Sequence, residues 1–124
     1  MTKKEEFIEI FNKYITREGA DRLLEYLDSP ASDFFTAPAS TRFHLSREEG
    51  LLEHSLNVYD CLVDYLSRPR VREQYGMEYS DESIAIVSLL HDLCKVNFYV
   101  LSLYSIFKGK RMIVSDDSIR SGCQ

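Results

Sequence analysis

Apolar residues recur at spacings of three and four near the start of the chain. The first set comprises Phe7, Ile10, Phe11, Tyr14 and Ile15. This periodicity is typical of one face of an amphipathic helix, so it predicts a first helix that ends before Gly19. A second, shorter set predicts a helix over residues 20–28, which Pro30 closes because proline cannot continue a helix.

Residues 30–49 break this pattern, since they are rich in serine, threonine, alanine and proline. The same stretch nevertheless contains Phe34, Phe35 and Phe43. A solvated linker would not carry three phenylalanines, because each exposes a large apolar surface. We therefore expect an ordered loop that these side chains anchor to the core.

The two strongest apolar patterns predict the central helices. The first predicted helix spans residues 50–67, with His54 on its buried face. Its stripe otherwise consists of Leu51, Ser55, Val58, Cys61, Leu62 and Tyr65. The second begins after Ser80, a residue type that caps helices well. Its stripe is Ile84, Val87, His91 and Cys94, and because the helix is apolar on most sides we expect it to be the central helix of a bundle.

The types of residue in the sequence change after Lys95. Residues 96–107 are aromatic and β-branched, and residues 108–110 form a lysine–glycine–lysine turn signal before a second short apolar run. This order is typical of a β-hairpin. The predicted fold class is therefore all-α, a helical bundle with a small β-hairpin after the central helix, in a single domain over residues 1–124.

Composition narrows the classes of protein to consider. A chain of 124 residues with 44% hydrophobic content has the size and apolar content of one folded domain. Its net charge of −5, with basic residues scattered among acids, argues against a tight binder of duplex DNA. No apolar run approaches the roughly 20 residues that span a bilayer, and no secretory signal is visible. These observations predict a cytoplasmic protein with no membrane partner.

The cysteines do not suggest a disulfide framework or a zinc finger. Cys61, Cys94 and Cys123 are an odd number, and no two are separated by two residues. Cys61 and Cys94 lie within the predicted helices. We expect both to be small core residues in a reducing compartment.

His91 and Asp92 are adjacent within the apolar second central helix. An ionised aspartate that leaves water costs several kcal/mol unless it finds a partner. A divalent metal would satisfy both side chains, particularly if His54 converges on the same point. Imidazole nitrogens with a carboxylate oxygen suit Fe, Mn, Zn, Co or Ni better than Ca or Mg alone. The sequence therefore predicts a metal site formed by His54, His91 and Asp92.

Two further residues are candidates for the same site. Lys95 lies on the same helical face as His91 and Asp92, where it could hold a substrate phosphate or form an ion pair with Asp92. His44 lies in the loop just before the helix of His54, and a site-lining role and an inert exposed position are about equally expected for it. The alternative for the whole cluster is a buried Asp–Lys ion pair beside two structural histidines.

These residues resemble the HD superfamily of metal-dependent phosphohydrolases. The resemblance lies in residues 50–59, which contain His54, and in residues 89–95, which contain His91, Asp92 and Lys95. It implies an HD-type bundle in which His54, His91 and Asp92 are metal ligands, Asp92 bridges if two metals bind, and Lys95 contacts phosphate. A loop histidine at the position of His44 is similar to the arrangement in HD-type 3′-to-5′ exoribonucleases.

The chain departs from the family pattern after Lys95. The family has a further aspartate ligand on a later helix, and here the only later acids are Asp116 and Asp117, which follow too soon. Three explanations are open: a chain that is truncated at its C-terminus, a site completed by Asp116, Asp117 or a partner chain, or a site without catalysis. Missing helices would leave apolar faces exposed, so we expect a homodimer or a large apolar groove.

The function expected from the residues and the resemblance is hydrolysis of a phosphoester in a nucleotide or short nucleic acid. A divalent transition metal, with or without Mg, would be the cofactor. Asp92 and Lys95 would be catalytic, and His44 and Lys95 would bind substrate. The alternatives are a non-catalytic HD-like module that binds a nucleotide or a protein partner, and a structural fragment whose histidines belong to the core.

Overall fold

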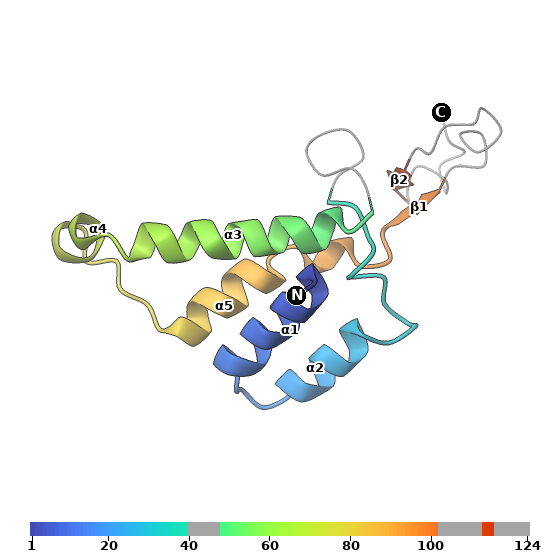
Figure 1. Ribbon diagram of the computed structural model, residues 1–124, viewed down its shortest axis with the longest axis horizontal. Coiled ribbons are helices and arrows are strands. Elements are labelled where there is room, and N and C mark those ends of the chain that lie inside the picture. The colour runs from blue at the N-terminus through green and yellow to red at the C-terminus, as the bar shows by residue number, and fades with distance from the viewer. Residues whose placement is uncertain (40–47, 102–112, 116–124) are drawn as a thin grey trace.

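The computed structural model describes residues 1–39, 48–101 and 113–115, and these are mainly helical (Figure 1). The helices are α1 (Lys3–Tyr14), α2 (Ala20–Leu27), α3 (Gly50–Leu66), α4 (Pro69–Gln74), α5 (Asp81–Leu90) and the short 3-10 helix η1 (Leu93–Lys95). Strands β1 (Tyr99–Leu101) and β2 (Ile113–Ser115) pair antiparallel. The prediction of a mainly helical chain is confirmed. The hairpin stays a prediction, because residues 102–112, which would form its turn, lie outside the described part.

Local side-chain chemistry determines where several helices begin. The Thr2 hydroxyl accepts a hydrogen bond from the Glu5 amide at 3.1 Å, and the Glu5 carboxylate accepts one from the Thr2 amide at 3.1 Å, which forms a capping box before α1. Gly19 precedes α2 with φ of 90°, a backbone conformation that glycine adopts without strain. The Ser80 hydroxyl accepts from the Ser83 amide at 3.1 Å, so the predicted Ser80 cap of α5 is confirmed.

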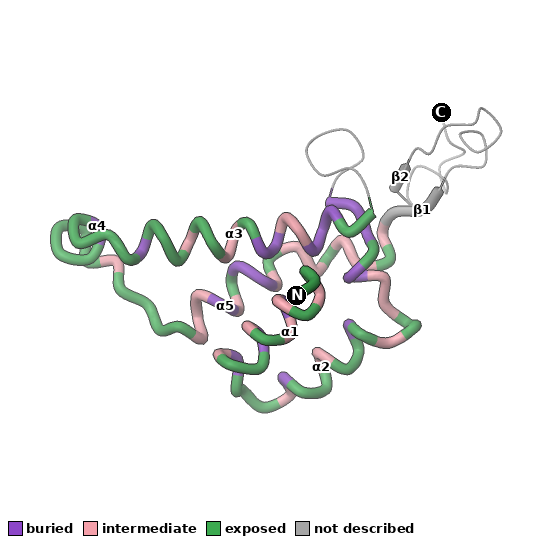
Figure 2. The backbone as a smooth tube through the Cα atoms, viewed as in Figure 1, coloured by how far each residue is buried: buried purple, intermediate pink, exposed green. Residues whose placement is uncertain are grey.

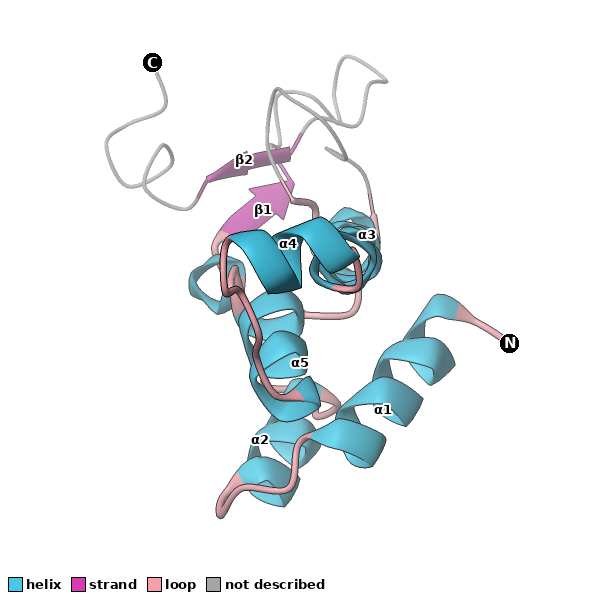
Figure 3. Cartoon of the chain, turned by 90° about the vertical axis from the view of Figure 1, so that its left-hand side faces the viewer, coloured by secondary structure: helices cyan, strands magenta, loops and turns pink. Residues whose placement is uncertain are grey.

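The helices pack around the contact between α3 and α5. Helix α5 lies against α3, and α1 packs against both of them (Figure 1). Figure 3 views α3 nearly along its axis, with α5 below it. Figure 1 shows that the two ends of α5 lie near different parts of α3, and each end carries a separate group of polar side chains.

Aromatic side chains form the centre of the core. Phe7, Phe34 and Phe35 contact one another, with ring centroids 5.0 to 5.4 Å apart. Both Phe34 and Phe35 are buried, so their predicted role as loop anchors is confirmed, whereas Phe43 lies outside the described residues. The buried part of α3 is mainly its first half, which contains His54 (Figure 2).

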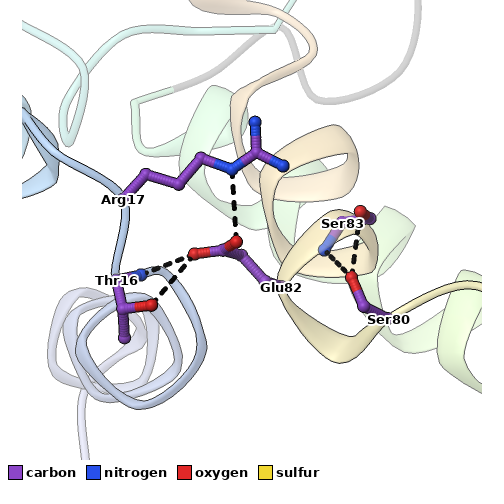
Figure 4. A network of polar contacts seen from close by, with 5 residues as sticks. All are labelled: Thr16, Arg17, Ser80, Glu82 and Ser83. Atoms are coloured by element: carbon purple, nitrogen blue, oxygen red, sulfur yellow. Dashed lines mark hydrogen bonds and ion pairs between the residues drawn. The ribbon is translucent and has the colours of Figure 1, made fainter.

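A carboxylate on α5 ties this helix to the end of α1. Glu82 accepts hydrogen bonds from the Thr16 amide at 2.8 Å, from the Thr16 hydroxyl at 3.2 Å and from Arg17 Nε at 3.2 Å (Figure 4). These donors, first the Thr16 amide and then Arg17, lower the pKa of Glu82 below its usual value. Every one of these contacts joins an acceptor to a donor, so the network is complete without any bound group.

Several predictions about the central helices are wrong. Helix α5 ends at Leu90, so His91 lies in the following turn and not on a helical stripe. Val87 is 60% exposed, and Cys61 and Cys94 are exposed rather than part of the core. The residues of α5 that are buried are Ala85, Ser88 and Leu89. In a helix with apolar residues on most sides, periodicity does not select the buried face, and here the positions of α1 and α3 select it.

The segment between α3 and α5 contains an additional helix, α4. Pro69 occupies the first turn of α4, where its missing amide is not needed. On one side of α3 and α5, Leu62, Met77 and Val87 line a small apolar cavity of about 190 Å³. None of the helices described by the structure is both long enough and apolar enough to span a membrane. The expected homodimer stays a prediction.

Candidate metal centre

Helix α3 and the turn after α5 bring His54, His91 and Asp92 together. His54 lies on α3 between buried neighbours, Leu51, Leu52, Ser55 and Leu56. These neighbours hold the helix against the core and leave the His54 side chain 21% exposed at the edge of the contact. His91 and Asp92 follow α5 directly. The end of the helix therefore turns both side chains toward His54, which is 37 residues earlier in the chain.

Each of the three residues contributes one potential metal-ligand atom, and these three atoms lie close to one another. His54 Nε2 lies 3.1 Å from His91 Nε2 and 3.4 Å from Asp92 Oδ2. His91 Nε2 lies 3.3 Å from the same oxygen. Among the residues that the structure describes, this is the group of histidine and acidic side chains that could hold a metal ion.

A main-chain carbonyl determines the protonation pattern of His91. Its Nδ1 lies 2.8 Å from the carbonyl oxygen of Ser88, which can only accept a hydrogen bond. Nδ1 therefore carries a proton, and in the neutral ring Nε2 presents a lone pair to His54 and Asp92. Metal-binding histidines characteristically donate their other ring N–H to a carbonyl or carboxylate in this way.

The contact between the two histidines needs a positive charge or a proton between its atoms. With a lone pair on His91 Nε2, a separation of 3.1 Å from His54 Nε2 is favourable if His54 donates a proton to it or if both nitrogens share a cation. Ligands held about 2.1 Å from one ion lie about 3.0 to 3.4 Å apart in octahedral or tetrahedral geometry. The three measured separations lie within this interval, and the two nitrogens and one carboxylate oxygen suit a divalent transition metal.

Lys95 joins this cluster to Ala39, in the segment before α3. Its Nζ donates to the carbonyl oxygen of Ala39 at 2.5 Å and lies 3.5 Å from Asp92 Oδ2. The Lys95 side chain is 29% exposed. It therefore lies within ion-pair distance of Asp92, as one of the two sequence alternatives expected, and a contact with phosphate stays a prediction.

Asn97 makes a second connection to the same segment. Its amide donates to Asp33 Oδ1 at 2.6 Å, and its side-chain Nδ2 donates to the carbonyl oxygen of Ala31 at 2.9 Å. Asn97 has φ of 59°, in the left-handed region that asparagine adopts more readily than most residues. The turn that carries His91 and Asp92 is thus followed by two residues, Lys95 and Asn97, that make three long-range hydrogen bonds to the segment before α3.

Sequence reasoning missed part of this support. The carbonyl groups of Ser88 and Ala39 leave no side-chain signature, so no pattern could have identified them. Asn97 was detectable in principle as an asparagine at a turn, but its partner Asp33 is 64 residues away. His44, Asp116 and Asp117 lie outside the described residues, and their predicted roles stay predictions.

Comparison of the chain with protein-family models, with curated proteins and with solved structures found no match. The assignment of the site therefore depends on its donor atoms and their geometry. The three side chains remain 19 to 30% exposed, so a small molecule can reach them from solvent.

Proposed function

We propose that this protein is a metal-dependent phosphohydrolase that acts on a nucleotide or a short nucleic acid. Its metal ligands are His54, His91 and Asp92, and the metal is one of Fe, Mn, Zn, Co and Ni. The observation that carries the proposal is the convergence of two imidazole nitrogens and one carboxylate oxygen at 3.1 to 3.4 Å. The reaction class is taken from the resemblance of the sequence to the HD superfamily. We also propose, on the same resemblance, that the helices form an HD-type bundle.

Three protein ligands are the number that a catalytic site uses, since the remaining positions stay open to water and substrate. A divalent metal, when bound, polarises a phosphoryl oxygen and lowers the pKa of a bound water. The Ser88 carbonyl orients the His91 ring so that Nε2 faces His54. Asp92 contributes the negative charge that favours a divalent cation over a proton at this position.

The proposed role of Lys95 combines positioning and charge. One of its N–H groups binds the Ala39 carbonyl, and its ammonium lies beside Asp92. This places a positive charge at the edge of the site, where a phosphate would be stabilised as it develops negative charge. His44 is proposed to line the same site from the loop between Ala39 and α3.

The first test is the metal content of protein purified without chelator, measured by elemental mass spectrometry. Wild type is expected to carry near-stoichiometric metal, and His54→Ala is expected to lose it. His44→Ala is the matched control, because it also removes a histidine near α3 but none of the three ligands. Equal metal content in wild type and His54→Ala would contradict the site.

The second test is hydrolysis of phosphodiester and phosphomonoester nitrophenyl substrates, nucleotides and short RNA by the metal-loaded protein. Asp92→Asn keeps the shape of the side chain and removes its charge, and it is expected to lower activity by at least about a hundredfold. Metal binding without turnover of any of these substrates would contradict the proposed hydrolase activity and favour the alternative of a non-catalytic binding module.

A further inference from the structure

A cavity lies at the opposite end of the α3–α5 contact from the candidate metal centre, and what we infer from it does not rest on the proposed function. The end of α1, the second half of α3, the region of α4 and the start of α5 enclose a cavity of about 290 Å³. Its walls include Tyr14 from α1, Tyr59 from α3 and Tyr79 from the segment before α5. These segments lie in the left half of Figure 1.

Tyr59 is the tyrosine of this cavity whose phenol is most strongly influenced by its surroundings. Tyr59 has a pKa raised to about 12 by burial, by its interaction with Tyr14 and by the nearby carboxylates of Asp81 and Asp60. Across the described ranges, none of the three tyrosine rings stacks on another aromatic ring.

The charged residues that line the cavity, which are Arg72, Glu78 and Asp81, carry a net negative charge. Arg72 and Glu78 form an ion pair with a separation of 2.9 Å, so these two lining groups neutralise each other. Asp81 also lines the cavity, and no ion pair to it occurs within the part of the chain that the structure describes. The positive end of the α5 dipole offsets the Asp81 charge only in part, because it corresponds to about half an elementary charge.

Two tyrosine rings in this region already contact basic side chains of the protein. Lys13 Nζ lies 5.1 Å from the centroid of Tyr14, and the guanidinium of Arg68 lies 6.0 Å from the centroid of Tyr65. Both distances are within the range of a cation–π interaction. A cation inside the cavity would meet further rings and, in addition, the Asp81 carboxylate.

We propose that this cavity binds a small organic cation of the quaternary ammonium class. Aromatic faces together with a carboxylate are the arrangement that recognises such ions. An anionic ligand would be repelled by the Asp81 carboxylate. A neutral apolar ligand would offer no counter-charge to Asp81, so a cation fits this lining better.

The test is titration of the full chain with choline and with 3,3-dimethylbutan-1-ol, which has the same shape but no charge. Binding is followed by amide chemical shifts in nuclear magnetic resonance spectra. Choline is expected to shift the amides around Tyr59, Tyr79 and Asp81 saturably, with the neutral isostere at least about fivefold weaker. Absence of saturable choline binding, or equal binding of the isostere, would overturn the proposal.

Substitutions of cavity residues test whether choline binds in this cavity. Asp81→Asn and Tyr79→Ser are each expected to weaken choline binding about fivefold or more, because they remove the carboxylate or one ring. Tyr79 is 58% exposed, so its variant tests the proposal even if a change at the start of α5 impairs folding. Tyr65→Ser is the matched control, since Tyr65 lies on α3 outside this cavity. Choline binding that both cavity variants leave unchanged would overturn the proposal.

Discussion

At the amino-terminal end of α5, the carboxylate of Glu82 meets three donors from Thr16 and Arg17. At the carboxyl-terminal end, the carboxylate of Asp92 meets two imidazole nitrogens, and the ammonium of Lys95 lies at the longer distance of 3.5 Å. Both ends join segments that are far apart in the sequence, and both lie at the border of the same core. They differ in the balance between donors and acceptors.

This difference helps to distinguish a structural polar network from a candidate ligand site. Around Glu82 every acceptor already has a donor within the protein, so the network stabilises the fold and needs nothing more. Around Asp92 one carboxylate oxygen and two imidazole nitrogens face one another, and a proton or a cation has to lie between them. The composition of the two clusters is similarly polar, so the comparison depends on atoms and distances and not on residue types alone.

The largest effect that would sharpen this comparison is stabilisation by metal. A divalent metal at a hundredfold excess over its Kd should stabilise wild type by about 2.7 kcal/mol and raise its Tm by about 10 °C. His54→Ala should lose this shift. Glu82→Gln should keep it, because the other end of α5 supplies no ligand. Thermal unfolding with and without chelator measures both, and a full shift in His54→Ala would break the comparison.

An intermediate effect on stability is expected when the basic side chain near each end of α5 is replaced by methionine. Lys95→Met should destabilise the metal-free protein by about 1.5 to 3 kcal/mol, because the half-buried Ala39 carbonyl loses a charged donor. Arg17→Met should cost less than about 1 kcal/mol, since the Arg17 side chain is 66% exposed. Urea unfolding in the presence of chelator measures both variants. Equal losses would show that the two cations are equivalent.

The smallest effect is the acid sensitivity of the Glu82 network. The pKa of Glu82 is lowered in the folded state from its usual 4.5, so its contribution to stability is present above pH 4.5 and is lost as the pH falls through the folded value. The stability difference between wild type and Glu82→Gln should therefore shrink between about pH 6 and about pH 3. Urea unfolding at several pH values measures it, and a difference that grows toward acid would refute this account.

Local patterns were sufficient for the helices and for the residues of the candidate site. The spacing of apolar residues predicted α1, α2 and α3, and Ser80 predicted the start of α5, because periodicity and capping depend on neighbours in the sequence. The adjacent His91 and Asp92 in an apolar stretch identified the candidate chemistry, since a carboxylate there needs a partner. All of these features are short-range.

The sequence by itself thus determined the helical character of the chain and which side chains could bind a metal. The tertiary structure decided that α5 ends at Leu90, that Cys94 is exposed, and that the Ser88 and Ala39 carbonyls support the site. It also decided the 3.1 Å separation of His54 from His91. The physical reason is that periodicity defines a face of a helix but not the neighbour that covers it, and main-chain groups are the same in every residue.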